Sequence, residues 1–417
     1  MLITQAPKGT EDLLPSESYK WQYLEKNFKE VCDHFGYREI RMPTFEHTEL
    51  FERGVGDTTD VVQKQMYTFL DKGGRSITLR PEGTASVARS FLQNSLYAQA
   101  MPIKMFYNIA CFRYENKQKG RLREFHQFGV EAFGAKEPSI DAEIVSLAIT
   151  FLEKAGLTDL SVNINSIGCP ECRKKYNDAL KEYFRGHLGE LCATCNERFE
   201  RNPLRILDCK SEICQSFAKD APTILEYICD DCREHFEQFK HNLDVMGIKY
   251  NVNPGIVRGL DYYTKTVFEI ISGPFTVCGG GRYDGMIEEF GGDSTPGIGF
   301  GLGIERLLIR LNELGIEIPK ENDIDLYIVP LGDTAGDYTK KLVLDLRKQG
   351  LNVETDHMKR GLKAQMKYAN KIDARYVAVI GDNEVEKGAV NLKNMETGEE
   401  TEVLVSGLFS VKRGERA

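Results

Sequence analysis

The apolar residues near the start of the chain recur at the spacing of a helix. Between Ser16 and Gly36 they stand three or four positions apart, at Trp21, Leu24, Phe28, Val31 and Phe35. This spacing places them on one face of a helix that starts near Pro15 and ends at Gly36. Residues 37–47, interrupted by Pro43, and 76–83 are typical of strands, and residues 84–96 predict a second helix.

A long hairpin is predicted by two strand-like runs, residues 103–115 and 123–134, which the polar loop 116–122 joins. Successive side chains of a strand point to opposite faces. One face of the second run therefore carries Phe125, Gln127, Gly129 and Glu131. An acid and an amide separated by glycine suit the floor of a polar ligand site better than a core. The alternative is a sheet surface that faces solvent.

Glycines alternate in the segment GIGFGLGIER, at Gly297, Gly299, Gly301 and Gly303. Such a strand lets another group approach its backbone closely. We expect a helix to begin at Ile304, which places Arg306 in its first turn, where an arginine can pair with phosphate. The spacing matches neither the dinucleotide-binding nor the P-loop pattern. Tight packing of strand against helix is the alternative explanation of the glycines.

The length of 417 residues predicts two or three domains. We expect a first domain over residues 1–323. Within it, residues 169–241 are Cys-rich, charged and mostly helical in pattern, and are here called the insertion. Strand and helix patterns alternate over residues 324–417, which predicts a small α/β domain with a parallel or mixed sheet.

The composition is that of an ordinary globular protein, with 41% hydrophobic and 28% charged residues. No run approaches the ~20 apolar residues of a membrane span, and the N-terminus has no signal-peptide pattern. We therefore expect a cytoplasmic protein that does not bind membranes. The net charge of −9 lies entirely in residues 1–323, because residues 324–417 contain 15 Lys and Arg and 15 Asp and Glu. A polyanion would be bound by local basic patches.

Three C-x-x-C pairs occur among the eleven cysteines, and all three lie in the insertion. They are Cys169 and Cys172, Cys192 and Cys195, and Cys229 and Cys232, and Cys209 and Cys214 lie in the same segment. This spacing is typical of tetrahedral zinc sites, and 19 residues separate the first two pairs. Free thiols are also good core residues. The sequence leaves both a structural Zn²⁺ and free thiols open.

The segment RGLDYY combines Arg258 with the adjacent Tyr262 and Tyr263. On a regular strand, one of two neighbouring tyrosines would face away from any common site. We expect Gly259 to bend the chain so that both tyrosines turn toward one pocket. Aromatic core packing is the alternative.

Separated motifs in a fixed order resemble those of the histidyl-tRNA synthetase family, within the class II aminoacyl-tRNA synthetases. The hairpin with FRYE and FHQFGVEAFG resembles motif 2, GIGFGLGIER resembles motif 3, and the Pro43 region resembles motif 1. The segments LRPEGT, KGRLREFHQFGVEAFG, RGLDYYTKTVFE and GGRYDG narrow the resemblance to the histidyl family. It covers nearly the whole chain, including a C-terminal domain that resembles an anticodon-binding module.

The resemblance implies an α+β fold and an enzymatic function. The catalytic domain would be a mainly antiparallel sheet flanked by helices, with a helical insertion and a C-terminal α/β anticodon-binding domain. The function would be that of a histidine–tRNA ligase of bacterial type. ATP, with Mg²⁺, would activate L-histidine to histidyl-adenylate and release pyrophosphate, and the histidine would pass to the 3′ end of tRNA-His. Motif 1 implies a homodimer.

The resemblance assigns the contacts to ATP to three arginines and one acid. Arginines neutralise developing charge at the α-phosphate because they are fixed, always-charged forks. The implied residues are Arg113, Glu115, Arg258 and Arg306. Arg258 and Arg113 are the implied catalytic residues, and Arg258 is particular to the histidyl family.

A histidine substrate offers an ammonium group and two ring nitrogens, which suit carboxylates and hydroxyls. The resemblance implies histidine contacts from Glu82, Gly83, Thr84, Gln127, Glu131, Tyr262 and Tyr263. A site that hydrogen-bonds both ring nitrogens can reject analogues by roughly 10⁴-fold.

For tRNA, the resemblance implies contacts from the hairpin loop to the acceptor end, through Gln118, Lys119 and Arg121. This chain has Asn116-Lys117 where many relatives carry Arg-Pro. In the last domain, lysines recur every four positions, at Lys359, Lys363, Lys367 and Lys371. We take Lys363 and Lys367 of this helix face as tRNA contacts, and a solvated face is the alternative.

Two other functions account for parts of the sequence. A non-catalytic, synthetase-like regulatory subunit of histidine biosynthesis would bind histidine but would lack the anticodon domain and motif residues. This chain keeps both. A zinc-dependent RNA-binding module would explain the cysteines, but it would leave the hairpin and the glycine strand unexplained.

Overall fold

The computed structural model describes residues 4–56, 59–116, 118–256, 258–320 and 324–410. The chain divides into two compact units, Met1–Ile318 and Pro319–Ala417. The domain boundary expected at residue 323 lies within 321–323, outside the described residues. No helix of the described residues is long and apolar enough to cross a membrane.

The first unit is built on an eight-stranded sheet with the strand order β1-β5-β6-β11-β10-β9-β7-β8. The strands are β1 (Arg38–Glu39), β5 (Ile103–Phe112), β6 (Glu124–Phe133), β7 (Leu160–Ser166), β8 (Asn251–Val252), β9 (Thr264–Ser272), β10 (Phe275–Arg282) and β11 (Gly297–Gly303). Neighbouring strands are antiparallel except for the pairs β1–β5 and β7–β8. The expected α+β fold with a mainly antiparallel sheet is confirmed.

The predicted hairpin is present, because β5 and β6 pair in continuous register from Ile103–Phe133 to Phe112–Glu124. Alternate residues of β6 then face opposite sides. Phe128, Val130 and Ala132 pack into the main core, whereas Gln127 and Glu131 point to the other side.

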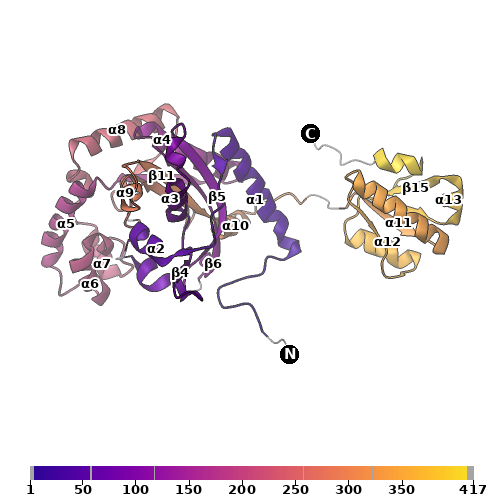
Figure 1. The fold of residues 1–417 in the computed structure, drawn as a ribbon, viewed down its shortest axis with the longest axis horizontal. Coiled ribbons are helices and arrows are strands. Elements are labelled where there is room, and N and C mark those ends of the chain that lie inside the picture. The colour runs from indigo at the N-terminus through magenta and orange to yellow at the C-terminus, as the bar shows by residue number, and fades with distance from the viewer. Residues whose placement is uncertain (1–3, 57–58, 117, 257, 321–323, 411–417) are drawn as a thin grey trace. The chain divides into compact units, whose positions relative to one another are not determined.

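Helices cover the core side of this sheet (Figure 1). They are α1 (Pro15–His34), α4 (Pro138–Lys154), α8 (Asp230–Val245) and α10 (Ile304–Glu313). Phe28 of α1 stacks on Phe128 with ring centroids 4.4 Å apart and meets Phe151 of α4 edge-on at 5.1 Å. Burying each such side chain stabilises the fold by about 1.5–3 kcal/mol. The helical spacing of the first apolar residues therefore serves the main core.

A second, smaller layer lies on the opposite side of the sheet. It contains α2 (Thr48–Val55), α3 (Thr84–Gln93), α9 (Met286–Glu289) and a three-stranded sheet of β2 (Phe45–His47), β4 (Ser76–Leu79) and β3 (Tyr67–Leu70). Val87, Ala88 and Phe91 of α3 pack against side chains of β5 in a separate apolar cluster. The polar face of β6 therefore lies between the large sheet and this second layer.

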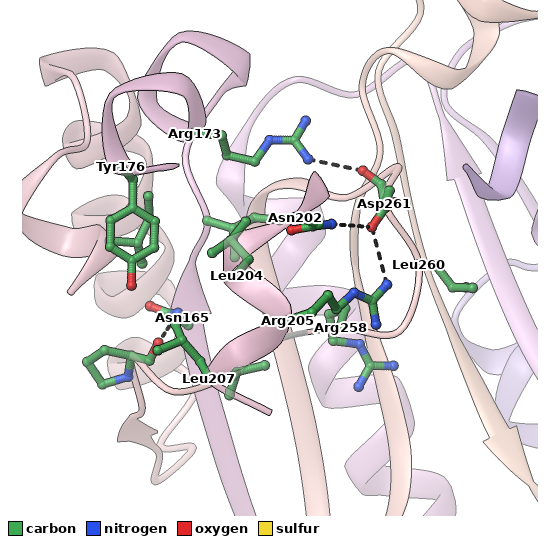
Figure 2. A pocket seen from close by; sticks show the side chains of 14 residues that line it. Asn165, Arg173, Tyr176, Asn202, Leu204, Arg205, Leu207, Arg258, Leu260 and Asp261 are labelled. Carbon is green, nitrogen blue, oxygen red and sulfur yellow. Dashed lines mark hydrogen bonds and ion pairs between the residues drawn. The ribbon is translucent and has the colours of Figure 1, made fainter. Parts of the chain in front are cut away.

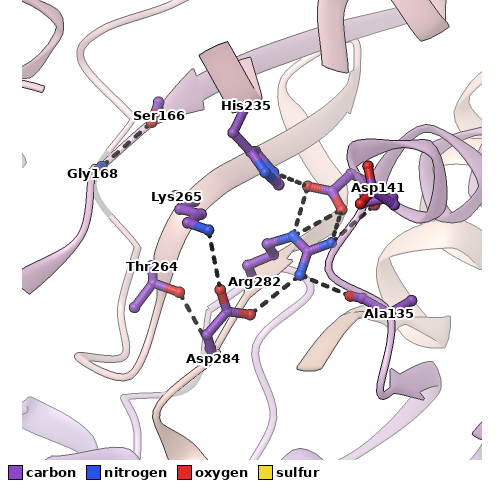
Figure 3. A network of polar contacts seen from close by, with 10 residues as sticks. Ala135, Asp141, Ser166, Gly168, His235, Thr264, Lys265, Arg282 and Asp284 are labelled. Carbon is purple, nitrogen blue, oxygen red and sulfur yellow. Dashed lines mark hydrogen bonds and ion pairs between the residues drawn. The ribbon is translucent and has the colours of Figure 1, made fainter. Parts of the chain in front are cut away.

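A buried ion network joins β10, α4 and α8 (Figure 3). Arg282 and Asp141 are both fully buried, with Arg282 Nη2 2.6 Å from Asp141 Oδ1, and His235 Nε2 lies 2.9 Å from Asp141 Oδ2. Burial opposes the charged carboxylate, yet the charge of Arg282 holds the pKa of Asp141 below its ordinary value. Removing one partner of such a pair typically costs 3–5 kcal/mol, so the network fixes β10 at the point where Tyr283 follows.

The insertion has its own apolar core. Its helices are α5 (Pro170–Arg185), α6 (Ala193–Arg201), α7 (Glu212–Ala218) and most of α8, and Figure 1 shows them gathered beside the sheet. Tyr176, Leu180 and Phe184 of α5 pack there with Phe199, Ile206 and Ile224. Five of the insertion's cysteines are buried in the same cluster: Cys172, Cys195, Cys209, Cys214 and Cys232.

The second unit is a mixed α/β sheet with the order β13-β12-β14-β15-β16. Its elements are β12 (Leu326–Pro330), α11 (Asp333–Lys348), β13 (Val353–Thr355), α12 (Leu362–Lys371), β14 (Tyr376–Ile380), α13 (Asp382–Lys387), β15 (Ala389–Asn394) and β16 (Glu400–Leu404). Lys363, Lys367 and Lys371 are exposed on α12. Lys359 precedes the helix, with a positive φ of 52°, so placing it on the same helix face was wrong.

Candidate functional site

Strand pairing brings the polar face of β6 against the glycines of β11. Gly299 stands opposite Glu131, Gly301 opposite Gly129, and Gly303 opposite Gln127. On the other side, Tyr107 of β5 stands opposite Gly129. The two strands of the hairpin and the distant strand β11 thus meet on one patch of the sheet.

Glu131 is the centre of this patch and is fully buried. Its Oε1 accepts hydrogen bonds from the hydroxyls of Thr84 at 2.8 Å and Tyr107 at 3.1 Å, and its Oε2 accepts one from Tyr283. Burial raises the pKa of Glu131 to about 8, against the opposing effect of these hydroxyls. A buried carboxyl group held by three hydroxyls is a good acceptor for a ligand N–H.

Three glycines leave room for these groups because they carry no side chain. A Cβ on Gly299 would occupy the position of Glu131 Oε2 and would also collide with the backbone oxygen of Val130. A Cβ on Gly83 would lie 2.5 Å from the Tyr107 ring, and one on Gly129 would overlap the same ring. Gly299 of β11, Gly129 of β6 and Gly83 are therefore explained by the close approach of side chains.

Gln127 and Glu82 flank the central carboxyl group. The Cys111 thiol donates to Gln127 Oε1 at 3.4 Å. The Glu82 carboxylate accepts the backbone N–H groups of Thr84 and Ala85 at 2.7 and 2.8 Å, so it caps the first turn of α3. Burial raises the pKa of Glu82. Sequence reasoning did not anticipate that Glu82 has this capping role.

The segment 258–263 is not a strand, since β9 begins at Thr264. The Tyr262 hydroxyl lies 3.5 Å from Thr84 Oγ1, and the rings of Tyr262 and Tyr263 are 4.5 Å apart. Both tyrosines are thus turned toward one region. The chain does bend at Gly259, but the bend does not require a glycine, because its φ is not positive and a Cβ there would meet no described atom within 4 Å.

Arg258 is paired with a carboxylate. Its Nη1 donates to Glu269 Oε1 at 2.5 Å, and its guanidinium lies 5.7 Å from the centroid of the Tyr263 ring. A Cβ on Gly279 would lie 2.5 Å from both terminal nitrogens, so the glycine leaves the space that Arg258 fills. Among the described residues, Arg258 Nε is buried without a hydrogen-bond partner.

Arg113, Glu115 and Arg306 lie together at the loop end of the hairpin. Arg113 Nε donates to Pro81 O at 2.8 Å, and Arg306 Nε donates to Gly120 O at 3.2 Å. Burial lowers the pKa of Arg306, and the nearby positive charge of Arg121 lowers it further, while Glu115 and Glu269 oppose both effects. Mutual repulsion of arginines in a partly buried place is typical of an anion site.

A pocket separates the segment 258–263 from the insertion (Figure 2). Asp261 is held from the insertion side by three contacts: Arg205 Nη2 donates to Asp261 Oδ1 at 3.2 Å, Asn202 Nδ2 to the same atom at 3.4 Å, and Arg173 Nη1 to the Asp261 carbonyl at 3.0 Å. The insertion therefore fixes the segment that carries Arg258 and the two tyrosines.

The residues expected to contact tRNA lie apart from this centre. In the hairpin loop, Gln118 forms an isolated bridge with Arg121, Arg121 pairs with Glu115 at 3.4 Å, and Lys119 pairs with Glu313. Lys117 lies outside the described residues. Lys363 and Lys367 belong to the second unit and form no ion pair among the described residues.

Sequence reasoning missed Tyr107, Tyr283, Glu269 and Asp261. Tyr283 lies inside the GGRYDG motif and Glu269 at the end of RGLDYYTKTVFE, so the motifs contained them without indicating a role. Tyr107 lies on the first hairpin strand, and only the strand register shows that it reaches Glu131.

Comparisons with known proteins agree on one family. A family model described as histidyl-tRNA synthetase matches residues 9–307, and one described as an anticodon binding domain matches residues 325–412. A histidine–tRNA ligase from Clostridium novyi is 61% identical over 410 residues, covering 98% of this chain and 99% of the relative. One from Acetivibrio thermocellus is 58% identical over 413 residues, with coverages of 98% and 99%.

The fold is also similar to a solved structure. The crystal structure of apo histidyl-tRNA synthetase from Staphylococcus aureus matches with a TM-score of 0.84 at 42% identity, covering 98% of this chain and 99% of that one. The similarity includes both units of the chain.

Proposed function

Because this chain belongs to the histidyl-tRNA synthetase family and ligates histidine to tRNA-His with ATP, we propose that histidine binds around Glu131 and ATP at the neighbouring arginines. The regulatory-subunit alternative is not favoured, since the relatives named histidine–tRNA ligase match nearly the full chain and the anticodon-binding domain is present. The roles below are assigned to this chain's own side chains.

Histidine recognition rests on hydrogen bonds from buried groups. Glu131 accepts an imidazole N–H, and the hydroxyl of Tyr262 or Tyr263 serves the other ring nitrogen. We assign Gln127 and Glu82 to the ammonium group as acceptors, with Thr84 and Gly83 beside them; Thr84 contacts both Glu131 and Tyr262. Because Glu131 and Tyr263 are buried and Tyr262 is partly buried, a substrate that lacks a ring nitrogen would leave a polar group of the site unpaired, which costs binding energy.

ATP activation requires neutralisation of charge at the α-phosphate while the histidine carboxylate attacks it and pyrophosphate leaves. We assign Arg258 and Arg113 to the α-phosphate and Arg306 to the remaining phosphates. Arg258 would keep its contact with Glu269 and offer its unpartnered Nε edge to the α-phosphate. Preorganised arginines of this kind stabilise the transition state without reorganisation at the moment of reaction.

The family implies Mg²⁺ with ATP. Oxygen ligands suit this ion, and Glu115 and Glu269 offer carboxylates near Arg306. These two residues would hold Mg²⁺, which neutralises phosphate charge when bound. The protein's own contribution remains the placement of the three arginines.

For tRNA, we assign Gln118, Lys119 and Arg121 to the acceptor end and Lys363 and Lys367 to phosphates near the anticodon. The three loop residues adjoin Arg306 through Gly120, which supports an approach of the 3′ end to the adenylate. We place the enzyme in the cytoplasm, where tRNA is charged.

We also propose a homodimer. The Pro43 region resembles motif 1, and Leu13, Leu14 and Phe45 are large apolar side chains that are 48%, 59% and 55% exposed in the single chain. Multi-angle light scattering should give the mass of two chains, and the mass of one chain would contradict the proposal.

One observation carries the assignment of the site. Side chains from four separated segments converge on the buried Glu131, either directly or through Thr84: Thr84, Tyr107, Tyr262 and Tyr283. No structural need of the core explains four hydroxyl-bearing residues around one carboxyl group, since apolar residues of equal volume would avoid the desolvation cost.

The division of roles is tested at Arg258. In the Arg258→Ala variant, single-turnover formation of histidyl-adenylate should slow by about 10²-fold or more, while calorimetry should give nearly unchanged histidine affinity. Arg258→Lys should recover only part of the rate, because lysine cannot form the planar fork. Arg41→Ala, at a side chain 84% exposed, is the control. Loss of histidine binding with intact chemistry would overturn the assignment.

A further inference from the structure

Eight of the eleven cysteines converge in two groups of four. In the first group are Cys169, Cys172, Cys229 and Cys232, and in the second are Cys192, Cys195, Cys209 and Cys214. Within each group all four sulfur atoms lie within 4.8 Å of one another. The first C-x-x-C pair therefore joins the third, and the second pair joins two cysteines with a different spacing.

The distances between sulfurs fit a single metal ion in each group. With Zn–S bonds of about 2.3 Å, the sulfurs of a tetrahedral site lie about 3.8 Å apart. Cys169 and Cys172 are 3.5 Å apart, and Cys192 and Cys209 are 3.8 Å apart. A disulfide would require about 2.05 Å. A four-iron cluster, in which each thiolate binds a different iron, would spread the sulfurs beyond the observed limit.

The backbone around each group is arranged for thiolates. Cys169, Cys192 and Cys229 are the N-cap residues of α5, α6 and α8, and their partners at the third following position lie in the first turns. The positive end of a helix favours a thiolate. Three sulfurs also accept backbone N–H groups: Cys172 from Cys229 at 3.1 Å, Cys214 from Cys192 at 3.4 Å, and Cys209 from Ser211 at 3.4 Å.

Gly168 allows the first group to close. Its φ of +65° belongs to the left-handed region, and a Cβ there would overlap the Cys172 side chain and lie 3.2 Å from its sulfur. Just beyond the group, the positive charge of Arg173 lies near Cys169, which offsets part of the negative charge of four thiolates.

Ordinary core packing of thiols does not explain this arrangement. The remaining three cysteines, Cys32, Cys111 and Cys278, are also buried, but each sits singly among apolar side chains of a larger core. Thiols that act only as small apolar groups have no reason to meet four at a time, twice, with backbone donors aimed at the sulfurs.

We propose that the insertion binds two structural zinc ions, one in each tetracysteine group. Each ion is held by four thiolates, which lose their protons on binding. Zinc fits better than harder ions because thiolates are soft ligands and both groups are closed, with no open position for catalysis. The first ion joins the N-termini of α5 and α8, and the second joins α6 to α7.

The consequence reaches the pocket between the insertion and the segment 258–263. Arg173 lies in the first turn of α5, and Asn202 and Arg205 follow α6, so each contact to Asp261 starts close to one of the two groups. An insertion of this size has a small core and needs such cross-links to hold its helices in place. The ions would therefore fix the insertion side of the pocket.

Metal analysis of the full-length protein, purified under reducing conditions without an affinity tag that binds metals, tests the proposal. We expect two zinc ions per chain by plasma mass spectrometry. Cobalt(II) added to protein freed of metal should give the visible absorption of tetrahedral thiolate coordination. This spectrum is independent of enzymatic activity.

Paired substitutions separate the two groups. Cys172→Ser with Cys232→Ser, and Cys195→Ser with Cys214→Ser, should each lose one zinc ion and keep the other. Cys32→Ala, at a single buried thiol outside both groups, should keep both. If a variant fails to fold, the zinc content and the cobalt spectrum of the unaltered chain still test whether two metal ions are bound.

Several results would overturn the proposal. These are less than one zinc per chain in the unaltered protein, two disulfides in place of metal, iron in place of zinc, or full zinc content in both paired variants. Loss of both ions from Cys32→Ala would show that retention depends on general folding and would count equally against two specific sites.

Discussion

Glu131 is a carboxyl group whose burial controls its protonation. Burial raises its pKa to about 8, whereas an unfolded glutamate has a pKa of about 4.3. Its three hydroxyl partners satisfy both oxygens. Burial therefore keeps this acid largely neutral at the centre of the proposed histidine site.

This predicts a pH-dependent stability cost. The stability that protonated Glu131 supports is fully present below about pH 4.3 and is lost as the pH rises through about 8. The Glu131→Gln variant stays neutral. The free energy of unfolding of this variant minus that of the unaltered chain should therefore increase as the pH rises from 5.5 to about 8.5. Denaturant titrations at several pH values measure the difference.

The control is Glu52→Gln, at an exposed position of α2. Its difference from the unaltered chain should stay flat over the same range. A flat difference for Glu131→Gln as well would mean that Glu131 is already ionised in the folded protein.

At the scale of elements, β11 shows why glycines alternate in motif 3. Gly299 and Gly301 face the same side of the strand as the site, but only Gly299 is opposite Glu131. A Cβ on Gly299 would overlap the carboxylate, whereas one on Gly301 would lie 3.5 Å from Gln127 Nε2, an ordinary contact. Alanine at Gly301 is therefore a matched control for alanine at Gly299.

We expect Gly299→Ala to raise the KM for histidine at least tenfold, because Glu131 must leave its position between the three hydroxyls. Overlap with Val130 O should also lower the free energy of unfolding, by about 1–3 kcal/mol. Gly301→Ala should change both quantities little. Histidine-dependent pyrophosphate exchange and thermal unfolding measure them, and equal effects at the two glycines would contradict this account of the strand.

At the scale of the whole molecule, the two units divide the reaction. The proposed adenylate chemistry lies in Met1–Ile318, and the lysines of α12 lie in Pro319–Ala417. The net negative charge of residues 1–323 makes local patches important for tRNA, since the protein as a whole repels a polyanion.

Reversing the charge of Lys363 and Lys367 together, with Lys363→Glu and Lys367→Glu, should lower kcat/KM for tRNA-His by about tenfold or more and leave pyrophosphate exchange unchanged. The salt dependence of tRNA binding should weaken by about one unit of slope per lysine. Lys341→Glu with Lys348→Glu, exposed on α11, is the charge-matched control. An equal loss from the control pair would attribute the effect to net charge alone.

The sequence by itself determined the local elements and the family. Apolar periods of 3.6 and 2 residues predicted α1, the β5–β6 hairpin and the helix that starts at Ile304, because side-chain direction follows from backbone geometry alone. The motifs identified the family, and the comparisons confirmed it. Alternation along β6 separated Gln127 and Glu131 from the core before any contact was known.

Only the tertiary structure decided which distant groups meet. The Tyr107 and Tyr283 hydroxyls at Glu131, Glu269 beside Arg258, and the insertion's hold on Asp261 all depend on strand register and on the packing of one segment over another. The same holds for the cysteines, whose spacing did not determine which pairs combine, while the fold joins the first pair to the third. Sequence separation says nothing about such pairings, because chain reversals bring residues together at any distance along the chain.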